Sequence, residues 1–173
     1  GRHDAVSTMW ASDGYGNSSF TSGAWEFGGT VLGTRDYEVG TMMLRTPRNA
    51  SNVSFPGKSL GFTGGSFNMD ATGTRTVTVN DLRLNGGATI GAYTSGGTQT
   101  LAGTIKAKNF TDNTIRGDTN LVVSAAITGG VGGGGITYLY NGTTLTGNNT
   151  GYQGATIIGD GRFSTLKISN ETN

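Results

Sequence analysis

Apolar and polar residues alternate in short runs along most of the chain. Thr76-Val77-Thr78-Val79 and Leu82-Arg83-Leu84 are two examples, in which every second residue is apolar. Successive side chains of a β-strand point to opposite faces, so a period of two predicts a strand with one buried face. No stretch shows the three- and four-residue spacing of an amphipathic helix. The pattern therefore predicts an all-β chain.

The apolar runs recur at a nearly constant distance, with glycine pairs between them. One apolar position recurs every 22 or 23 residues, at Leu60, Leu82, Ile105 and Ile127. A second position, which precedes the first in each unit, recurs every 22 to 24 residues, at Phe55, Val79, Leu101 and Val123. This alignment places Leu101 opposite Val79 and Gln99 opposite Val77. Glycine is typical of tight turns, since it tolerates positive φ angles.

A unit of about 22 residues with two or three short strands predicts one coil of a parallel β-solenoid. Coils of such a fold stack at about 4.8 Å, and their inward residues form one continuous core. An antiparallel β-sandwich is the alternative, but its loops vary more in length. We expect a single domain, with a solenoid over residues 36–173. Residues 1–35 form a segment without the repeat, which caps the core or donates a strand to a neighbour.

Composition excludes several classes of function. The 173 residues carry a net charge of +1, without a basic stripe that would bind nucleic acid. No apolar run is long enough to span a bilayer. The chain has no cysteine, and its one histidine is His3. Disulfides, thiolate metal sites and histidine-based metal clusters are thereby excluded, and the position of His3 near the terminus argues against a Ser-His-Asp triad. No cofactor is expected.

The remaining candidates for chemistry are carboxylates and aromatic rings. Solenoid enzymes that act on polysaccharides need paired carboxylates on adjacent coils. The repeat instead stacks Asp81 near Thr104 and Arg83 near Lys106, so we predict that the chain is not an enzyme. Tyr138 and Tyr140 lie two apart in one predicted strand and share a face. That face is part of the core if it points inward and a carbohydrate platform if it points outward.

Seven Asn-x-Ser/Thr sequons are present, which is consistent either with the Asn- and Thr-rich composition or with a glycosylated surface protein. The candidate acceptors are Asn17, Asn49, Asn52, Asn109, Asn141, Asn148 and Asn170.

Several segments resemble the autotransporter-associated β-strand repeat proteins of bacteria. They lie in patches between residues 36 and 168, and include Asp36–Val39, Leu44–Pro47 and Phe55–Leu60. The closest is Gly142–Ile157, which is similar to the family's unit G-T-L-T-L-x-G-x-N-T-Y-x-G-x-T-x-I. Trp10 and Trp25 correspond to two tryptophans upstream of the repeats. The resemblance implies a right-handed β-helix outside a bacterial cell, in an adhesin-like or fibre-forming protein.

A solenoid has two open ends whose unpaired backbone groups can bind another chain. We therefore expect an extracellular structural protein that forms a surface fibre by head-to-tail self-association. The candidate contact residues are apolar residues near both termini: Val6, Trp10, Phe20, Trp25, Phe27, Leu166 and Ile168. Two alternatives remain open. One is the passenger fragment of an adhesin that binds carbohydrate or host ligands, and the other is a polysaccharide-active enzyme.

Overall fold

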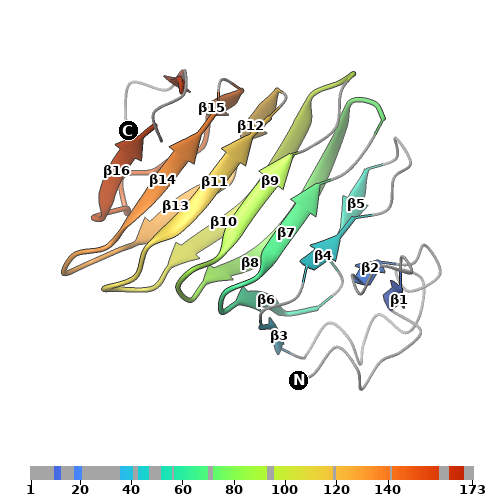
Figure 1. The fold of residues 1–173 in the computed structure, drawn as a ribbon, viewed down its shortest axis with the longest axis horizontal. Helices are drawn as coiled ribbons and strands as arrows, with labels where there is room; N and C mark the ends of the chain where they lie inside the picture. Colours follow the sequence, from blue (N-terminus) through green and yellow to red (C-terminus); the bar gives the residue numbers. More distant parts are fainter. Residues whose placement is uncertain are drawn as a thin grey trace.

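The fold is a β-solenoid of about five turns (Figure 1). The computed structural model describes residues 10–12, 18–20, 36–40, 43–46, 52–55, 57–69, 72–92, 96–118, 120–140, 142–159 and 164–169, with the first two ranges described at the level of the backbone. Within these residues there is no helix, and every strand pair except β1 with β2 is parallel. The predicted solenoid is confirmed, and the antiparallel β-sandwich is wrong.

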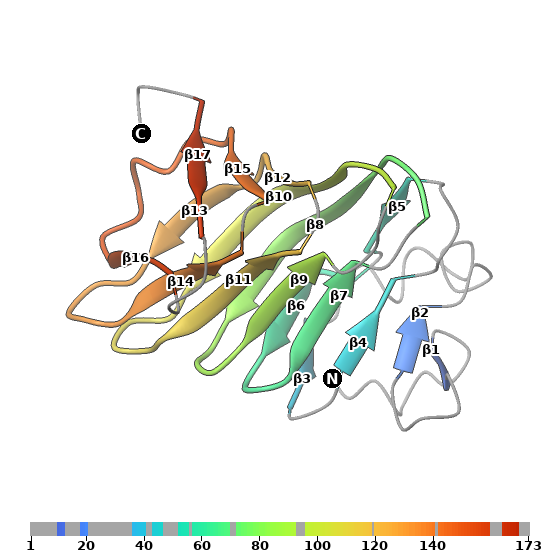
Figure 2. The ribbon, with the colours of Figure 1, turned by 45° about the horizontal axis from the view of Figure 1, so that its top comes forward.

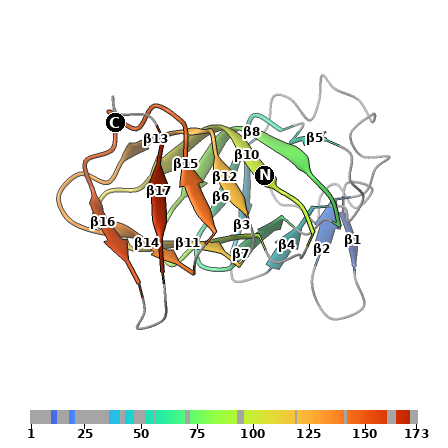
Figure 3. The same cartoon turned by 90° about the horizontal axis from the view of Figure 1, so that it is seen from above.

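The strands form two sheets that face each other as two layers (Figure 3). Sheet A contains, in spatial order, β1 (Trp10–Ser12), β2 (Ser18–Phe20), β4 (Met43–Arg45), β7 (Ser66–Met69), β9 (Thr89–Ala92), β11 (Asn113–Gly117), β14 (Gly135–Leu139) and β16 (Ala155–Ile158). Sheet B contains β3 (Asp36–Val39), β5 (Val53–Ser54), β6 (Ser59–Phe62), β8 (Arg75–Leu84), β10 (Gln99–Ala107), β12 (Leu121–Val123), β13 (Ala126–Gly129), β15 (Thr143–Leu145) and β17 (Leu166–Ile168).

Each coil crosses from sheet B to sheet A and back again. β6, β7 and the first half of β8 make one such coil, and the second half of β8, β9 and the first half of β10 make the next. β8 and β10 are long because each runs through the bend between two parts of sheet B (Figure 2). Equivalent positions of successive coils therefore lie side by side, and we call each such series a column.

Inward columns form the core, as the alternating pattern predicts. The series Leu60, Leu82, Ile105 and Ile127 is one column, in register through three strand pairs and buried throughout. Another, in sheet A, runs through Leu44, Phe67, Ile90, Ile115 and Tyr138. Each residue of a column packs between its two neighbours in that column and is buried. Burial of each aliphatic side chain contributes about 1.5–3 kcal/mol to the free energy of folding.

The second predicted series is confirmed from Leu101 to Val123, but it is wrong by two residues between Val79 and Leu101. Leu101 pairs with Val77, and Val79 pairs with Gly103. The register shifts between Gly103 and Ile105, since β8 has two residues where β10 has one. An alignment with a fixed repeat length cannot include such a bulge. The predicted alignment therefore fails in this half of the coil.

The same shift brings two polar residues together inside the solenoid. Arg75 is opposite Gln99, and both are buried. The Arg75 Nε donates to Gln99 Oε1 at 3.0 Å, a guanidinium nitrogen of Arg75 donates to the Thr46 hydroxyl, and Gln99 Nε2 donates to the Gly73 carbonyl at 2.6 Å. Buried polar groups are stable when they are hydrogen-bonded in this way. The core is therefore polar around Arg75 and Gln99.

At the N-terminal end, sheet A extends beyond sheet B. β2 pairs in parallel with β4, and β1 pairs antiparallel with β2. In sheet B the first described strands, β3 and β5, belong to the same coil as β4. The β1–β2 hairpin thus adds two strands to its own sheet, and sheet A projects by two strands beyond the described part of sheet B at this end (Figures 1 and 2).

Candidate functional site

The last described coil leaves core positions uncovered. Ile158 continues the sheet A column of Tyr138, and Ile168 continues the column of Leu145 in sheet B. Their column neighbours are at most 5% exposed, whereas Ile158 and Ile168 are 54% and 57% exposed. Exposure arises because no described strand follows β16 or β17. We call this surface, formed by the outer edges of β16 and β17 and the space between them, the C-terminal face.

A hollow of about 230 Å³ lies between the two sheets at the C-terminal face. Its lining is mixed apolar and polar, and consists of Ile127, Tyr138, Leu145, Asn149, Tyr152, Gly154, Thr156 and Ile168. The Tyr152 hydroxyl donates to the Ala155 carbonyl at 2.8 Å, which fixes the ring at the rim. Burial raises the pKa of both Tyr138 and Tyr152, so both phenols are neutral near pH 7. The hollow therefore offers an uncharged surface.

The edge strands of the C-terminal face also present backbone groups. β16 pairs with β14, and β17 pairs with β15; neither has a second partner among the described strands. An edge strand with unpaired N–H and C=O groups is a template for a further strand. Apolar side chains and unpaired backbone thus occur together on one surface.

The predicted contact residues have different positions. Ile168 is exposed on the C-terminal face, and Leu166 is half-buried beside Thr143. Trp10 and Phe20 pair in register within the β1–β2 hairpin, at the opposite end of sheet A (Figure 1). Val6, Trp25 and Phe27 lie outside the described residues.

Sequence reasoning missed two residues of this surface. Ile157 and Ile158 in β16 are 43% and 54% exposed. Ile158 continues an inward column, so its exposure depends on whether another strand packs beside it, which no local pattern reveals; Ile157 continues the outward column of Thr137.

The charged residues on the outer face of sheet B neutralise one another. Asp81 forms ion pairs with Arg83 at 2.7 Å and with Lys106 at 3.1 Å, and Arg83 also lies 3.5 Å from Asp36. Burial raises the pKa of Asp81, but hydrogen bonds from Arg83 and Lys106 outweigh it, and the net pKa is lowered. A hydrogen bond from Ser59 lowers the pKa of Asp36.

Asp36 and Arg83 of this network line a shallow hollow of about 130 Å³, together with Glu38, Gly61 and Asn85. A general acid at neutral pH needs a carboxyl group with a raised pKa. Asp36 and Asp81 have the opposite shift and are ionised. This ion-pair network is therefore an arrangement for stability, and we assign no proton transfer to it.

The predicted tyrosine pair does not share a face. Tyr138 is 2% exposed and belongs to the core. Tyr140 follows the end of β14 and has a φ of 65°, which turns its side chain away from the strand pattern. The Arg116 guanidinium lies 4.6 Å from the centre of the Tyr140 ring, in a cation–π contact. These two rings form no carbohydrate platform.

Three of the predicted glycosylation acceptors are described, and each is exposed. The side-chain oxygen of Asn52 accepts from the Thr76 amide at 2.8 Å, that of Asn109 from the Val131 amide at 3.1 Å, and that of Asn148 from the Thr150 amide at 3.1 Å. These bonds satisfy backbone amides in strand β8 and in two turns, which is a structural reason for asparagine. Asn17, Asn49, Asn141 and Asn170 lie outside the described residues, and glycosylation stays a prediction.

Among the described residues, no group of three or more His, Cys, Asp or Glu side chains could hold a metal ion. That part of the chain also has no helix long and apolar enough to cross a membrane.

No protein-family model, curated protein or solved structure matches the chain. The resemblance to autotransporter-associated repeats therefore stays a prediction from the sequence.

Proposed function

We propose that this chain is an extracellular structural protein whose subunits associate end to end into a fibre on a bacterial surface. The observation that supports the proposal is the C-terminal face, where uncovered core positions and unpaired strand edges coincide. Each coil inside the solenoid is held to its neighbour by the same two features. A contact between the end of one copy and the beginning of the next repeats without closing, and so generates a fibre.

The chemistry of the described side chains fits a structural role. The carboxylates of sheet B are ion-paired and ionised, and the neutral C-terminal hollow contains no nucleophile beside a base. Association of this kind needs no cofactor, since backbone hydrogen bonds and apolar burial supply the binding free energy. The absence of cysteine is consistent with export, and together with the family resemblance it supports the extracellular location.

The direct test places charge on the C-terminal face. In Ile158→Lys/Ile168→Lys, two ammonium groups lie on the C-terminal face, and burial of an unpaired ammonium group by association would cost several kcal/mol. We expect wild-type filaments in negative-stain electron microscopy and large species in sedimentation velocity. The double variant should sediment as a monomer.

The matched control is Val131→Lys. Val131 is an aliphatic side chain that is 43% exposed, but it lies in the turn between β13 and β14 rather than on the C-terminal face. This variant should assemble like the wild type. Wild-type protein that remains monomeric at all concentrations would overturn the fibre.

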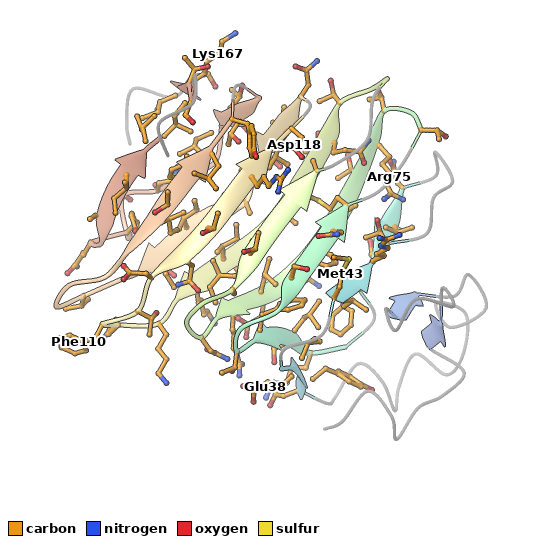
Figure 4. The ribbon with its side chains drawn as sticks, in the orientation of Figure 1. Glu38, Met43, Arg75, Phe110, Asp118 and Lys167 are labelled. Carbon is orange, nitrogen blue, oxygen red and sulfur yellow. The ribbon has the colours of Figure 1, made fainter. Side chains whose placement is uncertain are left out.

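One observation favours an adhesin as the second candidate. Phe110 is 74% exposed and has a φ of 59°, in the turn between β10 and β11 (Figure 4). A bulky residue in this conformation is strained, and strain of this kind gathers at functional sites. The ring lies against Gly132, where a Cβ would be 2.3 Å from the ring. Binding of a glycan array by wild-type protein, with loss in Phe110→Ala, would support this alternative.

A further inference from the structure

The two ends of the solenoid differ in shape, and this restricts how two copies meet. At the C-terminal face both sheets end in the same coil, with β16 and β17. At the other end, the β1–β2 hairpin makes sheet A two strands longer than the described part of sheet B. A parallel solenoid with flush ends would continue as a simple stack of coils, but this one has a step.

The step blocks the simplest contact. Suppose that β5 of a second copy paired with β17 and extended sheet B in parallel. β4 of the second copy would then lie next to β16, because β4 and β5 belong to one coil. β2, which precedes β4 in sheet A, would fall on β16 itself. In this structure the hairpin therefore excludes parallel stacking of sheet B on β17.

One pairing avoids the overlap. We propose that β16 of one copy pairs antiparallel with β1 of a second copy, so that sheet A continues across the contact; this inference rests on the proposed end-to-end assembly. β16 has a partner on one side, β14, and β1 has a partner on one side, β2, among the described strands. β16 is parallel to β14, and β1 is antiparallel to β2, so the polarity at the junction is antiparallel.

The columns set the register of this pair. Ile158 belongs to the column of Leu44 through successive pairs in sheet A. At the other end, Ser18 pairs with Leu44, and Ser12 pairs with Ser18. Continuation of the column therefore places Ser12 of the second copy opposite Ile158.

Sheet B makes no direct strand pair in this arrangement. Between β17 and the nearest described strands of the second copy, two strand positions remain, or about 10 Å at the usual spacing. The contact is a strand addition at the edge of a single sheet, in which each hairpin stays on its own β4.

Two pairs of engineered cysteines distinguish the arrangements, because the chain has no cysteine of its own. Ser12→Cys protein is mixed with Ile158→Cys protein to probe the antiparallel pair in sheet A. Val53→Cys protein is mixed with Ile168→Cys protein to probe parallel stacking in sheet B. Opposed Cα atoms lie about 4.5–5.5 Å apart in antiparallel pairs, which is within reach of a disulfide. Each variant alone provides its background of homodimers.

We expect oxidation of the assembled protein to give a disulfide-linked dimer of Ser12→Cys with Ile158→Cys, and loss of that product when Ile168→Cys replaces Ile158→Cys. A product from Val53→Cys with Ile168→Cys would show that the hairpin is displaced and would overturn this inference while the fibre stands. Filaments without either product would overturn it as well. Wild-type protein that forms no assembly in electron microscopy would instead overturn the proposed function.

Discussion

Single residues set the backbone path in the middle of sheet B. Gly103 lies in β10 with a φ of 109°, where side chains are strained. A Cβ at this position would lie 2.0 Å from the Val79 carbonyl oxygen of the neighbouring strand. Because the contact is with backbone, no side chain can move to relieve it. Glycine at this position therefore allows the bulge that separates the two halves of the sheet.

Replacement of Gly103 should destabilise the fold. We expect Gly103→Val to lower the free energy of unfolding by about 3 kcal/mol or more, through strain and steric overlap with Val79. Urea denaturation followed by circular dichroism measures the loss. The control is Ala102→Val, at the adjacent outward position of β10, where a β-branched residue suits a strand. Equal stability of the two variants would contradict this account of Gly103.

Asp81 links protonation to stability. Its pKa is lower in the folded chain than the ordinary value of 3.8. A depressed carboxyl pKa contributes stability that is present above the unfolded pKa and lost as pH falls through the folded pKa. We therefore expect Asp81→Asn to be less stable than wild type at pH 7, with the difference shrinking as the pH falls below 3.8 and through the lowered pKa of the folded chain.

Urea denaturation at several pH values provides the measurement. Asp112→Asn is the control, since Asp112 is exposed and forms no ion pair in the part of the chain that the structure describes. It removes the same charge without breaking the network around Arg83. A pH-independent effect of Asp81→Asn would show that the ion pairs contribute little.

At the level of strands, sequence reasoning succeeds where the pattern is local. The alternation of Thr76 to Val79 predicts a strand with one buried face, and β8 has it. The series of Leu60, Leu82, Ile105 and Ile127 is in register as expected, since each coil has nearly the same number of residues between these positions.

Prediction from the repeat fails where the backbone follows different paths in successive coils. Leu101 lies opposite Val77 rather than Val79, because paired residues on that side of the bulge are 24 positions apart and not 22, and no local property of Asn80 or Asp81 reveals the bulge. The position of Arg75 inside the core is equally invisible, because an arginine in an alternating run predicts an outward side chain. Tyr140 leaves its strand through a positive φ that tyrosine rarely adopts. Each failure concerns backbone geometry rather than hydrophobicity.

For the whole molecule, the candidate site lies at an end of the solenoid, and local sequence patterns indicate poorly which strands form that end. Ile168 is predictable because it lies in a clean alternating run near the last residues. Ile158 is not, although the two side chains are the last described members of inward columns, one in each sheet. The projection of β1 and β2 beyond sheet B results from pairing across the molecule, and the N-terminal sequence has no repeat from which to infer it.

The glycine-rich bend between β13 and β14 has a consequence for engineering. A Cβ at Gly133 would have no atom within 4 Å, and Val131, Gly132 and Gly133 are all exposed. The core columns lie on either side of this bend, and Val131, Gly132 and Gly133 belong to none of them. A foreign peptide inserted after Gly133 should therefore be displayed outside the coils with little loss of stability. The entropic cost of closing a surface loop grows only slowly with the length of the loop. Thermal denaturation of such an insertion variant would measure this tolerance, with an equal insertion after Leu101 as the control. A tolerated insertion would make the solenoid a carrier for vaccine epitopes or binding loops.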